Sequence, residues 1–396
     1  MPLSGVRVVD LTRILAGPFA TMLLGDLGAD VVKVEHPDGG DDTRAWGPPW
    51  VPGAGGASAY FTSVNRNKRS CTLDFKTEAG REVLWRLVEG ADVVISNFRP
   101  GVLDRVGLGW EAVHARSPGV IYVLINGYGA VGPAAKKPAF DVIVQGESGV
   151  MDLTGHPGGP PTRVGISLGD ETAGLLAVQG ILAALLVRER TGLGQRVEIA
   201  LHDGLLSLLT FHAQIWWAGG RAPTRIGNAH PSIVPYQTFP TADGWMNVGV
   251  GNDGQWKRFC EAVERPEWIG ARAYRTNADR LVHREELVPL IEQILRGRPT
   301  EEWIEALSAV DVPCGRIRPV AEALDSPEAR ARGMIVEVEG ADGEPLPLLG
   351  PAVQLSASPA RVRRRPPDLG EHTEQVLAEL GYDASEIGEL KANQVV

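Results

Sequence analysis

One carboxylate in this sequence stands where it could act as a reagent. Asp170 lies in the run GISLGDETAG (165–174), between Gly169 and the start of a long apolar stretch. An aspartate at such a position commonly caps the following helix by accepting backbone N–H groups. Alternatively, the glycines leave one side open, and the carboxylate attacks an acyl group that carries a good leaving group. We expect the positive helix end to lower the pKa of Asp170 and keep the side chain ionised.

Other familiar catalytic and nucleotide-binding patterns are absent. The first predicted strand is followed by LAGP (15–18) rather than GxGxxG, and the chain contains no GxxxxGK[ST], GxSxG or HExxH. The usual nicotinamide, ATP, serine-hydrolase and metallopeptidase sites are therefore disfavoured. The eight histidines show no metal-ligand spacing, and Cys71, Cys260 and Cys314 lie far apart. We expect no metal site and no disulfide framework.

Composition limits the partners and the compartment. A net charge of -10 over 396 residues argues against a nucleic-acid or anionic-membrane partner, because both require clustered positive charge. Asp10 and Arg13 interrupt the apolar residues at the N-terminus. This interrupted pattern is typical of a strand and turn rather than a signal peptide. The longest apolar run, 173–187, is shorter than the roughly 20 residues that span a bilayer. We expect a cytoplasmic protein.

The first third of the chain alternates strand-like and helix-like segments. Such alternation predicts an α/β fold with a parallel sheet covered on both faces, and ligands at the carboxyl ends of its strands. The predicted strands are 6–11, 29–35, 71–75, 92–96 and 120–125, and the predicted helices are 17–28, one between Thr77 and Gly90, and 110–116.

Two domains are expected from the pattern of the remaining chain. The helix at 173–187 is apolar all round, which predicts burial, and a strand follows it. From 236 the pattern becomes mixed α+β, with a hairpin turning at Asp243–Gly244. The tail lacks apolar residues for a core of its own and is expected to return to the first domain. The predicted division is a large domain at 1–200, a linker helix and loop at 201–235, a small α+β domain at 236–325, and the return to the large domain at 326–396.

Basic residues follow several of the predicted strands. Arg13 follows the first strand, His36 the second and Asn97 the fourth, with Arg105 and Lys137 farther along. The carboxyl ends of parallel strands converge on one crevice, where such side chains suit a phosphorylated nucleotide. Solvated loops are the alternative, as for most charged residues. The spacing alone leaves both interpretations open.

A glycine-rich run, GVGNDGQ (249–255), lies in the second predicted domain. Its three glycines, Gly249, Gly251 and Gly254, are consistent with the mobile end of a hairpin. They are also consistent with a loop that folds over a reacting centre and excludes water.

Taken in order, several long motifs resemble class III CoA-transferases, the family of formyl-CoA and carnitine CoA-transferases and α-methylacyl-CoA racemase. The resemblance covers nearly the full length. It is carried by VRVVDLTRILAGPFATMLLGDLGADVVKVE, GDDTRAWGPP, NRNKRSCTLDFKTEAG, NFRPGVLDRVGLGW, GISLGDETAG, VPCG (312–315), LGEHT and KANQVV.

The resemblance implies roles for particular residues. Asp170 falls on the catalytic aspartate that forms covalent intermediates, with Gly169 and the acidic Asp141 supporting it and the loop 249–255 shielding the intermediate. No cofactor beyond CoA as substrate, and no metal, is implied. The positions implied to hold CoA are Arg13, Leu15, Ala16, His36, Leu73, Lys76, Asn97, Phe98, Arg105 and Lys137, with Lys136 as the alternative to Lys137.

The family's architecture implies a large Rossmann-like domain with a smaller inserted α+β domain, in a ring-shaped chain that forms an interlocked homodimer. The racemase pattern has a histidine directly before the aspartate, where this chain has Phe140, and a glutamate in the loop, where it has Asn252–Asp253. Transfer is therefore favoured over racemisation. A noncatalytic CoA-binding protein is the third alternative.

Among the transferases, the segments DDTRAWGPP and GNAHPSIVPYQTF are most similar to the succinyl-CoA:glutarate branch. Leu15 replaces the glutamine of the formyl-specific enzyme. We expect succinyl-CoA or a similar donor and a carboxylic, in particular a dicarboxylic, acceptor. Arg44 and His230 are candidates to face the distal carboxylate, and a surface role is the alternative.

Overall fold

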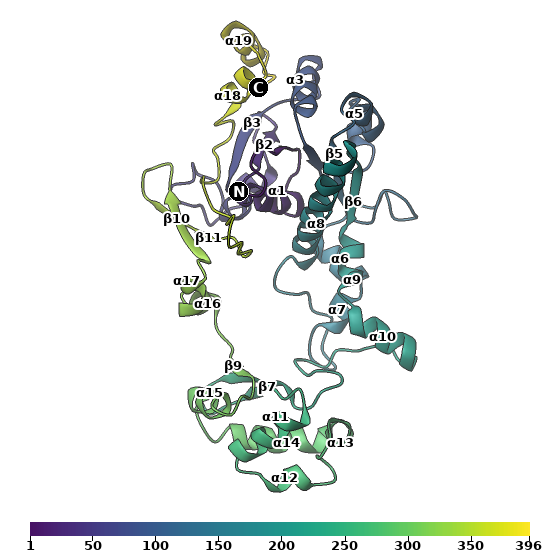
Figure 1. Ribbon diagram of the computed structural model, residues 1–396, viewed down its shortest axis with the longest axis vertical. Coiled ribbons are helices and arrows are strands. Elements are labelled where there is room, and N and C mark those ends of the chain that lie inside the picture. The colour runs from purple at the N-terminus through teal and green to yellow at the C-terminus, as the bar shows by residue number, and fades with distance from the viewer. The chain divides into compact units, whose positions relative to one another are not determined.

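The computed structural model describes residues 1–396, which divide into two compact units (Figure 1). The first unit combines Met1–Val150, Arg163–Ala218 and Pro327–Val396, and the second combines Met151–Thr162 and Gly219–Ser326. In this division the C-terminal tail belongs with the N-terminal part of the chain. Residues 201–218, predicted as part of a linker, also belong to the first unit.

A six-stranded parallel sheet forms the centre of the first unit, in the order β3-β2-β1-β4-β5-β6. This is the order of doubly wound nucleotide-binding folds, in which the chain reverses direction across the sheet between β1 and β4. The predicted α/β class with a parallel sheet is confirmed. The strands are β1 (Arg7–Asp10), β2 (Asp30–Glu35), β3 (Lys68–Thr72), β4 (Val93–Ser96), β5 (Ile121–Asn126) and β6 (Arg196–Ala200).

Helices α1 (Ala16–Asp26) and α8 (Leu168–Thr191) cover one face of this sheet. Neighbouring strand residues point to opposite faces, and Val8 of β1 faces the core shared with these two helices. At Gly174 a side-chain Cβ would lie 2.8 Å from the carbonyl oxygen of Ala16. Glycine at this position therefore lets the start of α8 approach the start of α1.

The opposite face is covered by α3 (Glu78–Glu89) together with α18 (Thr373–Glu379) and α19 (Ala384–Ala392). The C-terminal segment thus contributes to the core of the first unit, and Figure 1 marks the C-terminus beside these last helices. The final residues also reach the sheet, because the carbonyl of Val395 accepts the N–H of Asp74 at 2.7 Å.

The first unit contains further short elements around the sheet. They are the 3-10 helix η1 (Asp42–Ala45), α2 (Ala59–Ser63), α4 (Val102–Arg105), α5 (Trp110–Arg116), α6 (Asp141–Glu147), α9 (Leu201–Ser207), α10 (Thr210–Gly219), α17 (Pro327–Ala331) and the antiparallel pair β10 (Ile335–Glu339) and β11 (Pro345–Leu349), while α7 (Val150–Leu153) crosses the unit boundary.

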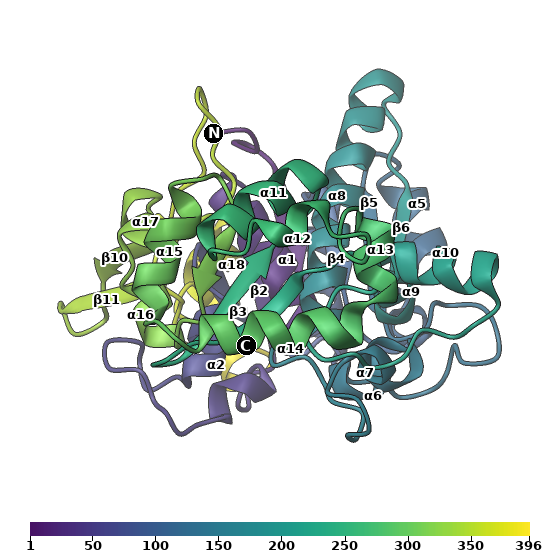
Figure 2. The same cartoon turned by 90° about the horizontal axis from the view of Figure 1, so that it is seen from below.

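The second unit is built on an antiparallel sheet in the order β7-β8-β9. Asp243 lies in the turn between β7 and β8, and its carboxylate accepts the N–H and the hydroxyl of Thr300, each at 2.8 Å. Figure 2 shows the helices of this unit from a second direction. The elements are β7 (Tyr236–Pro240), β8 (Trp245–Gly249), β9 (Cys314–Arg316), α11 (Asp253–Ala262), α12 (Glu267–Gly270), α13 (Asn277–Val282), α14 (Arg284–Leu295), α15 (Thr300–Ser308) and α16 (Val320–Leu324).

Helix α8 is longer and less buried than its sequence predicts. It extends beyond the predicted 173–187 at both ends, and Ala177 on the sheet side is fully buried. On the other side Leu175, Leu182 and Leu186 are 56%, 38% and 51% exposed. The prediction of burial all round is therefore wrong for the single chain. By length and hydropathy α8 is a candidate membrane span, a test that the core helices of soluble proteins also meet.

A buried ionic cluster joins the strands beneath α1. Asp10 at the end of β1 accepts hydrogen bonds from Lys68 at 3.1 Å, from Thr21 at 2.6 Å and from Thr12 at 2.5 Å through its hydroxyl. Burial raises the pKa of Asp10, but the charges of Lys68 and Lys33 and the hydroxyl bonds outweigh this effect and bring the pKa to about 2. Asp10 is therefore ionised at neutral pH.

We predict that Asp10→Asn lowers the free energy of unfolding by about 3 kcal/mol, because it leaves Lys68 without its buried counterion. Urea unfolding followed by circular dichroism measures the change. Glu82→Gln is the matched control, since Glu82 pairs with Arg86 on the exposed side of α3; it should change the stability by less than about 0.5 kcal/mol. Equal effects of the two variants would contradict the importance of the buried pair.

Candidate active site

Asp170 lies inside the first turn of α8 rather than at its cap. Ser167 occupies the N-cap position and makes no side-chain cap bond. Instead, the N–H of Gly169 donates to Oδ1 of Asp141 at 2.8 Å. The capping interpretation of Asp170 is therefore excluded, because Asp141 supplies the carboxylate that satisfies the helix start.

Asp141 and Gln145, one turn apart on α6, hold the segment that leads into α8. Oδ2 of Asp141 accepts the Gln145 amide at 2.7 Å. The same amide group of Gln145 donates to the carbonyl of Ile166 at 3.3 Å, and its oxygen accepts the N–H of Val164 at 2.9 Å. Together with the bond to Gly169, these contacts fix the backbone directly before Asp170.

The Asp170 carboxylate is partly buried and accepts no hydrogen bond. Burial, followed by the negative charges of Asp141 and Glu171, raises the pKa of Asp170 to about 7. The expectation of a lowered pKa is therefore wrong, because burial and two like charges raise it. The same charges act on Tyr60. Burial, followed by the charge of Asp170, raises the pKa of the Tyr60 phenol to about 12.

At the reversal point of the sheet, the turn after β1 meets the residues that follow β4. The side chain of Asn97 accepts the N–H of Arg13 at 2.9 Å and donates to the carbonyl of Arg13 at 2.7 Å. The guanidinium of Arg13 lies 5.5 Å from the ring centre of Phe98. Leu15 and Ala16 follow directly at the start of α1. The structure thus brings five of the predicted CoA-binding residues together at the carboxyl ends of β1 and β4.

His36 and Lys76 lie beyond the ends of β2 and β3, on either side of Asp74. Nε2 of His36 is 3.8 Å from the Asp74 carboxylate, which also accepts the N–H of Lys76 at 3.0 Å. Leu73 is 1% exposed and its side chain belongs to the core. Only the backbone of Leu73 is therefore placed to meet a ligand.

Arg105 and Lys137 are exposed, as Lys76 is. Arg105 ends the short helix α4, and Lys137 forms an ion pair with Glu147 and lies 5.4 Å from the ring centre of Tyr128. A cavity of about 160 Å³ opens nearby at the ends of β4 and β5, with Phe98 in its wall. Both cations remain on the side of the sheet where the crevice was predicted.

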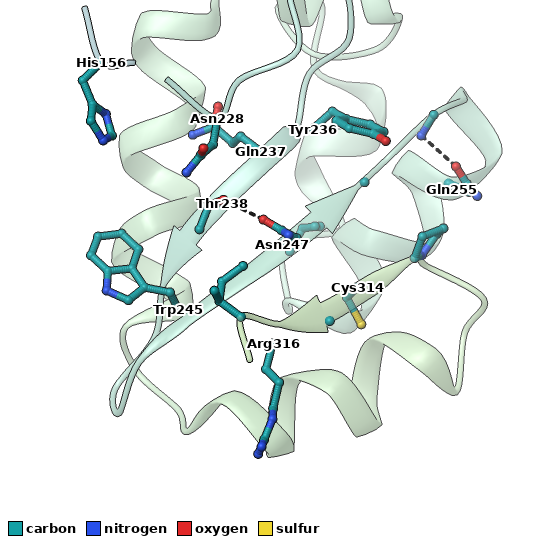
Figure 3. A pocket seen from close by; sticks show the side chains of 16 residues that line it. His156, Asn228, Tyr236, Gln237, Thr238, Trp245, Asn247, Gln255, Cys314 and Arg316 are labelled. Atoms are coloured by element: carbon teal, nitrogen blue, oxygen red, sulfur yellow. Dashed lines mark hydrogen bonds between the residues drawn. The ribbon is translucent and has the colours of Figure 1, made fainter. Parts of the chain in front are cut away.

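In the second unit, a cavity of about 1120 Å³ lies over the sheet β7-β8-β9 (Figure 3). Tyr236, Trp245 and Arg316 line it together with part of the glycine-rich loop. Arg316 is held by Glu301 and Glu322, so its charge is already balanced within the unit. The cavity therefore presents aromatic rings and neutral polar groups rather than a free charge.

The glycine-rich loop connects the end of β8 with α11. Asn252 caps α11 by accepting the N–H of Gln255 at 2.9 Å, and the Gln255 side chain accepts the N–H of Gly251 at 2.7 Å. Neither Gly249, Gly251 nor Gly254 has a positive φ. The backbone conformation thus gives no reason for glycine here. Space does, because a Cβ at Gly249 would lie 3.3 Å from the Tyr236 ring and one at Gly254 would lie 3.2 Å from Oδ1 of Asn252.

The sequence model of the protein family described as CoA-transferase family III matches residues 3–373 of the chain. The chain is a CoA-transferase of this family. The family resemblance predicted from the motifs is confirmed.

The transferase is similar to proteins across its whole length. It is 42% identical over 382 residues to succinate–glutarate CoA-transferase of Agrobacterium fabrum (strain C58 / ATCC 33970), with 96% of each chain covered. It is 39% identical to succinyl-CoA:glutarate CoA-transferase of Homo sapiens, covering 100% of this chain and 90% of the human protein. A CAIB/BAIF family protein from Brucella suis superposes with a TM-score of 0.86 and 41% identity, covering 96% and 99% of the two chains.

Several contacts in the transferase were not foreseen from the sequence. Gln145 lies four residues after Asp141, a spacing that places both on one helix face and could have signalled their bond. No such spacing indicated that Tyr60 lies within reach of the Asp170 charge.

Arg44, a candidate for a distal carboxylate, is instead held by both oxygens of Glu35 at 2.8 and 2.7 Å and lies 3.7 Å from the Phe61 ring centre. That guanidinium is already fully engaged.

We predict that Asp170→Asn stabilises the transferase increasingly as the pH rises from 5 to 8. A carboxylate whose pKa is raised in the folded state destabilises that state as the pH passes from its unfolded pKa toward 7. The gain at pH 8 should reach about 2 to 4 kcal/mol, the upper value following from the shift before solvent screening. Urea unfolding at several pH values measures it.

Asp203→Asn serves as the control for this titration, because the Asp203 side chain is 77% exposed on α9. It should leave the free energy of unfolding within about 0.5 kcal/mol of wild type throughout. If the gain from Asp170→Asn were the same at pH 5 and pH 8, the raised pKa would be contradicted.

Proposed function

We propose that the transferase moves CoA from succinyl-CoA or a similar acyl-CoA to a carboxylic acid, in particular a dicarboxylic acid, with Asp170 as the nucleophile. The observation that carries this proposal is the Asp170 carboxylate itself, which is held in the first turn of α8 without a hydrogen-bond partner. The substrate pair is supported by the names of the relatives, which act on succinate or succinyl-CoA and glutarate.

The reaction begins when a carboxylate oxygen of Asp170 attacks the thioester carbonyl carbon. A C–O bond forms, the C–S bond breaks, and its electron pair leaves on the CoA thiolate, giving an aspartyl-acyl anhydride. The thiolate then attacks the aspartyl carbonyl and expels the donor acid, which leaves an aspartyl-CoA thioester. The acceptor carboxylate attacks this thioester to form a second anhydride, and the released thiolate attacks its acyl carbonyl. The new acyl-CoA forms and the Asp170 carboxylate is restored.

The environment of Asp170 favours the first step because it destabilises the free carboxylate relative to the acylated form. Burial and the charges of Asp141 and Glu171 destabilise the free carboxylate, as its raised pKa shows. Acylation removes that charge, so part of the destabilisation is relieved as the bond forms. The energy of the thioester is retained in each intermediate, so the proposal requires no ATP, metal or cofactor beyond CoA as substrate.

The residues around the sheet reversal supply the proposed CoA site. Arg13 and Lys76 provide positive charge at the ends of β1 and β3, and His36 provides an imidazole at the end of β2, which suits the phosphates of CoA. Binding energy from these remote groups orients the thioester. We assign the loop of Gly249, Gly251 and Gly254 to covering the intermediate, and the exposure of Gly251 and Gly254 supports that role.

The proposal includes a ring-shaped chain and an interlocked homodimer in the cytoplasm. The apolar stripe of Leu175, Leu182 and Leu186 on α8 supports burial against a second subunit rather than lipid. Three free cysteines are consistent with a reducing compartment.

We predict that Asp170→Ala lowers transfer from succinyl-CoA by about 10⁴-fold or more, since no other group replaces the nucleophile. Asp203→Ala, at an exposed site, should retain activity. The assay pairs succinyl-CoA with a panel of mono- and dicarboxylic acids, and mass spectrometry of the wild type should find CoA on the peptide that contains Asp170.

An active Asp170→Ala variant would refute this mechanism. Uptake of α-deuterium into a 2-methylacyl-CoA from deuterated water would indicate racemisation instead. CoA binding without exchange of label between thioester and free acid would indicate a noncatalytic protein.

We predict that light scattering after size-exclusion chromatography gives twice the 42.4 kDa mass of one chain. The mass should persist on dilution to nanomolar concentration, because linked rings separate only when one ring opens. A single-chain mass at any of these concentrations would contradict the interlocked dimer.

A further inference from the structure

The turn between β1 and α1 contains a residue in an unfavourable conformation. Ile14 has a φ of 70°, in the left-handed region. Cβ branching makes this region costly for isoleucine, and such residues persist only where the surroundings hold them. The neighbours of Ile14 are Arg13 and Leu15, two of the residues assigned to CoA.

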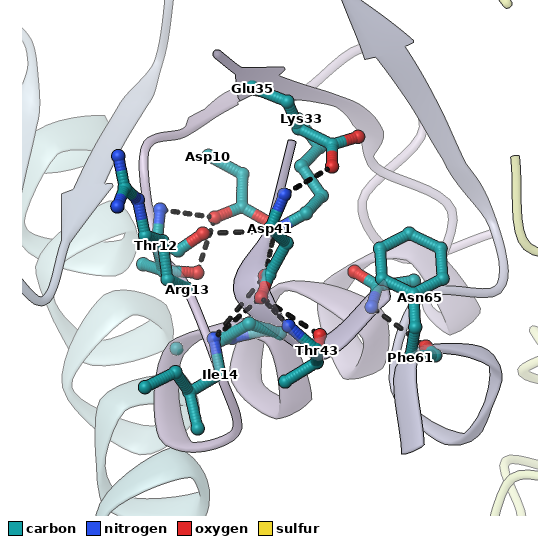
Figure 4. Close-up of polar contacts among 12 residues, drawn as sticks. Asp10, Thr12, Arg13, Ile14, Lys33, Glu35, Asp41, Thr43, Phe61 and Asn65 are labelled. Carbon is teal, nitrogen blue, oxygen red and sulfur yellow. Dashed lines mark hydrogen bonds and ion pairs between the residues drawn. The ribbon is translucent and has the colours of Figure 1, made fainter. Parts of the chain in front are cut away.

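The Asp41 carboxylate holds Ile14 in this conformation (Figure 4). The N–H of Ile14 points at the Asp41 carboxylate, with both oxygens at 3.2 Å from the nitrogen. The same carboxylate accepts the N–H of Thr43 at 3.0 Å and its hydroxyl at 2.8 Å, at the start of η1. Asp41 therefore ties the turn after β1 to the segment after β2.

Lys33 fixes Asp41 from the sheet side. Its ammonium lies 2.9 Å from Oδ2 of Asp41 and donates to the carbonyl of Thr12 at 2.9 Å. The two side chains are 0% and 1% exposed, so packing determines where the pair sits. Lys33 thus holds the residue two positions before Ile14 as well as the carboxylate that holds Ile14.

Asn97 completes the arrangement from β4 by bonding both backbone groups of Arg13. Three side chains therefore fix the turn 13–16: Lys33 from β2, Asp41 from the segment after β2, and Asn97 from the residues after β4. Neither Asp41 nor Lys33 reaches solvent, so their contacts serve the shape of this turn rather than a ligand.

We propose that Asp41 is a positioning residue of the CoA site: by holding Ile14 in the left-handed conformation, it keeps the turn 13–16 in the form that binds CoA. The inference rests on the proposed function, because it assumes that CoA binds at this turn.

Isothermal titration of coenzyme A into wild type, Asp41→Asn and Asp42→Asn provides the first test. The amide nitrogen of asparagine accepts no hydrogen bond, so Asp41→Asn weakens the hold on Ile14. The Kd of CoA should rise at least about 5-fold, as expected when a strained conformation loses its support. The value of kcat at saturating acyl-CoA should change by less than about 2-fold, which places the defect in binding. Asp42 is adjacent but exposed, and Asp42→Asn should bind like wild type.

Ile14→Gly separates positioning from general stabilisation. Glycine adopts the left-handed conformation without a steric cost. The double variant Asp41→Asn/Ile14→Gly should therefore bind CoA about as well as Ile14→Gly alone. A residue that only stabilises the fold would lower the melting temperature without changing Kd and would show no such rescue. An unchanged Kd in Asp41→Asn, or a double variant as weak as Asp41→Asn, overturns the inference.

Ile14→Pro tests the same idea if Asp41→Asn does not fold. Proline fixes φ near −65° and removes the N–H that Asp41 accepts, so the Kd of CoA should again rise at least about 5-fold. An unchanged Kd overturns the inference. A wild-type protein that does not bind CoA overturns the proposed function and this inference with it, whereas binding that is intact in every variant overturns only the role of Asp41.

Discussion

The hydrogen bond from the N–H of Gly169 to Asp141 is the contact on which the active site depends. A helix start needs an acceptor for its free N–H groups, and an aspartate within the first turn would ordinarily compete for that task. Since Asp141 of another helix performs it, Asp170 keeps both oxygens unengaged. The same arrangement places two carboxylates in one partly buried region, where burial and the charge of Asp141 raise the pKa of Asp170, the proposed nucleophile, to about 7. Asp141 thus both satisfies the start of α8 and contributes to the raised pKa of Asp170.

Ionic groups are also buried near the carboxyl ends of the strands. Asp10 with Lys68, and Asp41 with Lys33, lie where the strands end and the turns begin. A buried ion pair adds little net stability compared with well-packed apolar residues, so its value lies in the geometry it enforces. Here each carboxylate accepts several donors from separate chain segments. The ions act as fixed points to which the loops at the carboxyl ends of the strands are attached.

The sequence predicted those parts of the fold that local patterns determine. Thr77 and Gly90 bracket α3 as their capping chemistry requires, and β1, β2, β4 and β5 fall on the predicted apolar runs. The third strand was predicted at 71–75, but β3 is Lys68–Thr72, where buried Lys68 and Arg69 pair with carboxylates and hide the strand from a hydropathy pattern. Periodicity failed for α8, because hydropathy alone does not distinguish an apolar residue that is exposed on the single chain from one that faces the core. Asp170 is proposed as the nucleophile from its neighbours in sequence and from the family resemblance. The sequence did not predict that Asp141 caps the start of α8 or that Asp41 holds Ile14, because each of these contacts joins residues that lie far apart in the sequence.

The bond between Val395 and Asp74 bears on how the protein is made. A ribosome delivers the six strands of the sheet long before it delivers α18 and α19, which cover the face shared with α3. Until then α3 covers that face only in part, and the edge near β3 lacks its final contact. The first unit therefore cannot mature during synthesis of its own N-terminal part. Its folding is completed only after residues 373–395 have been made, which leaves part of the nascent sheet exposed to other apolar surfaces in the meantime.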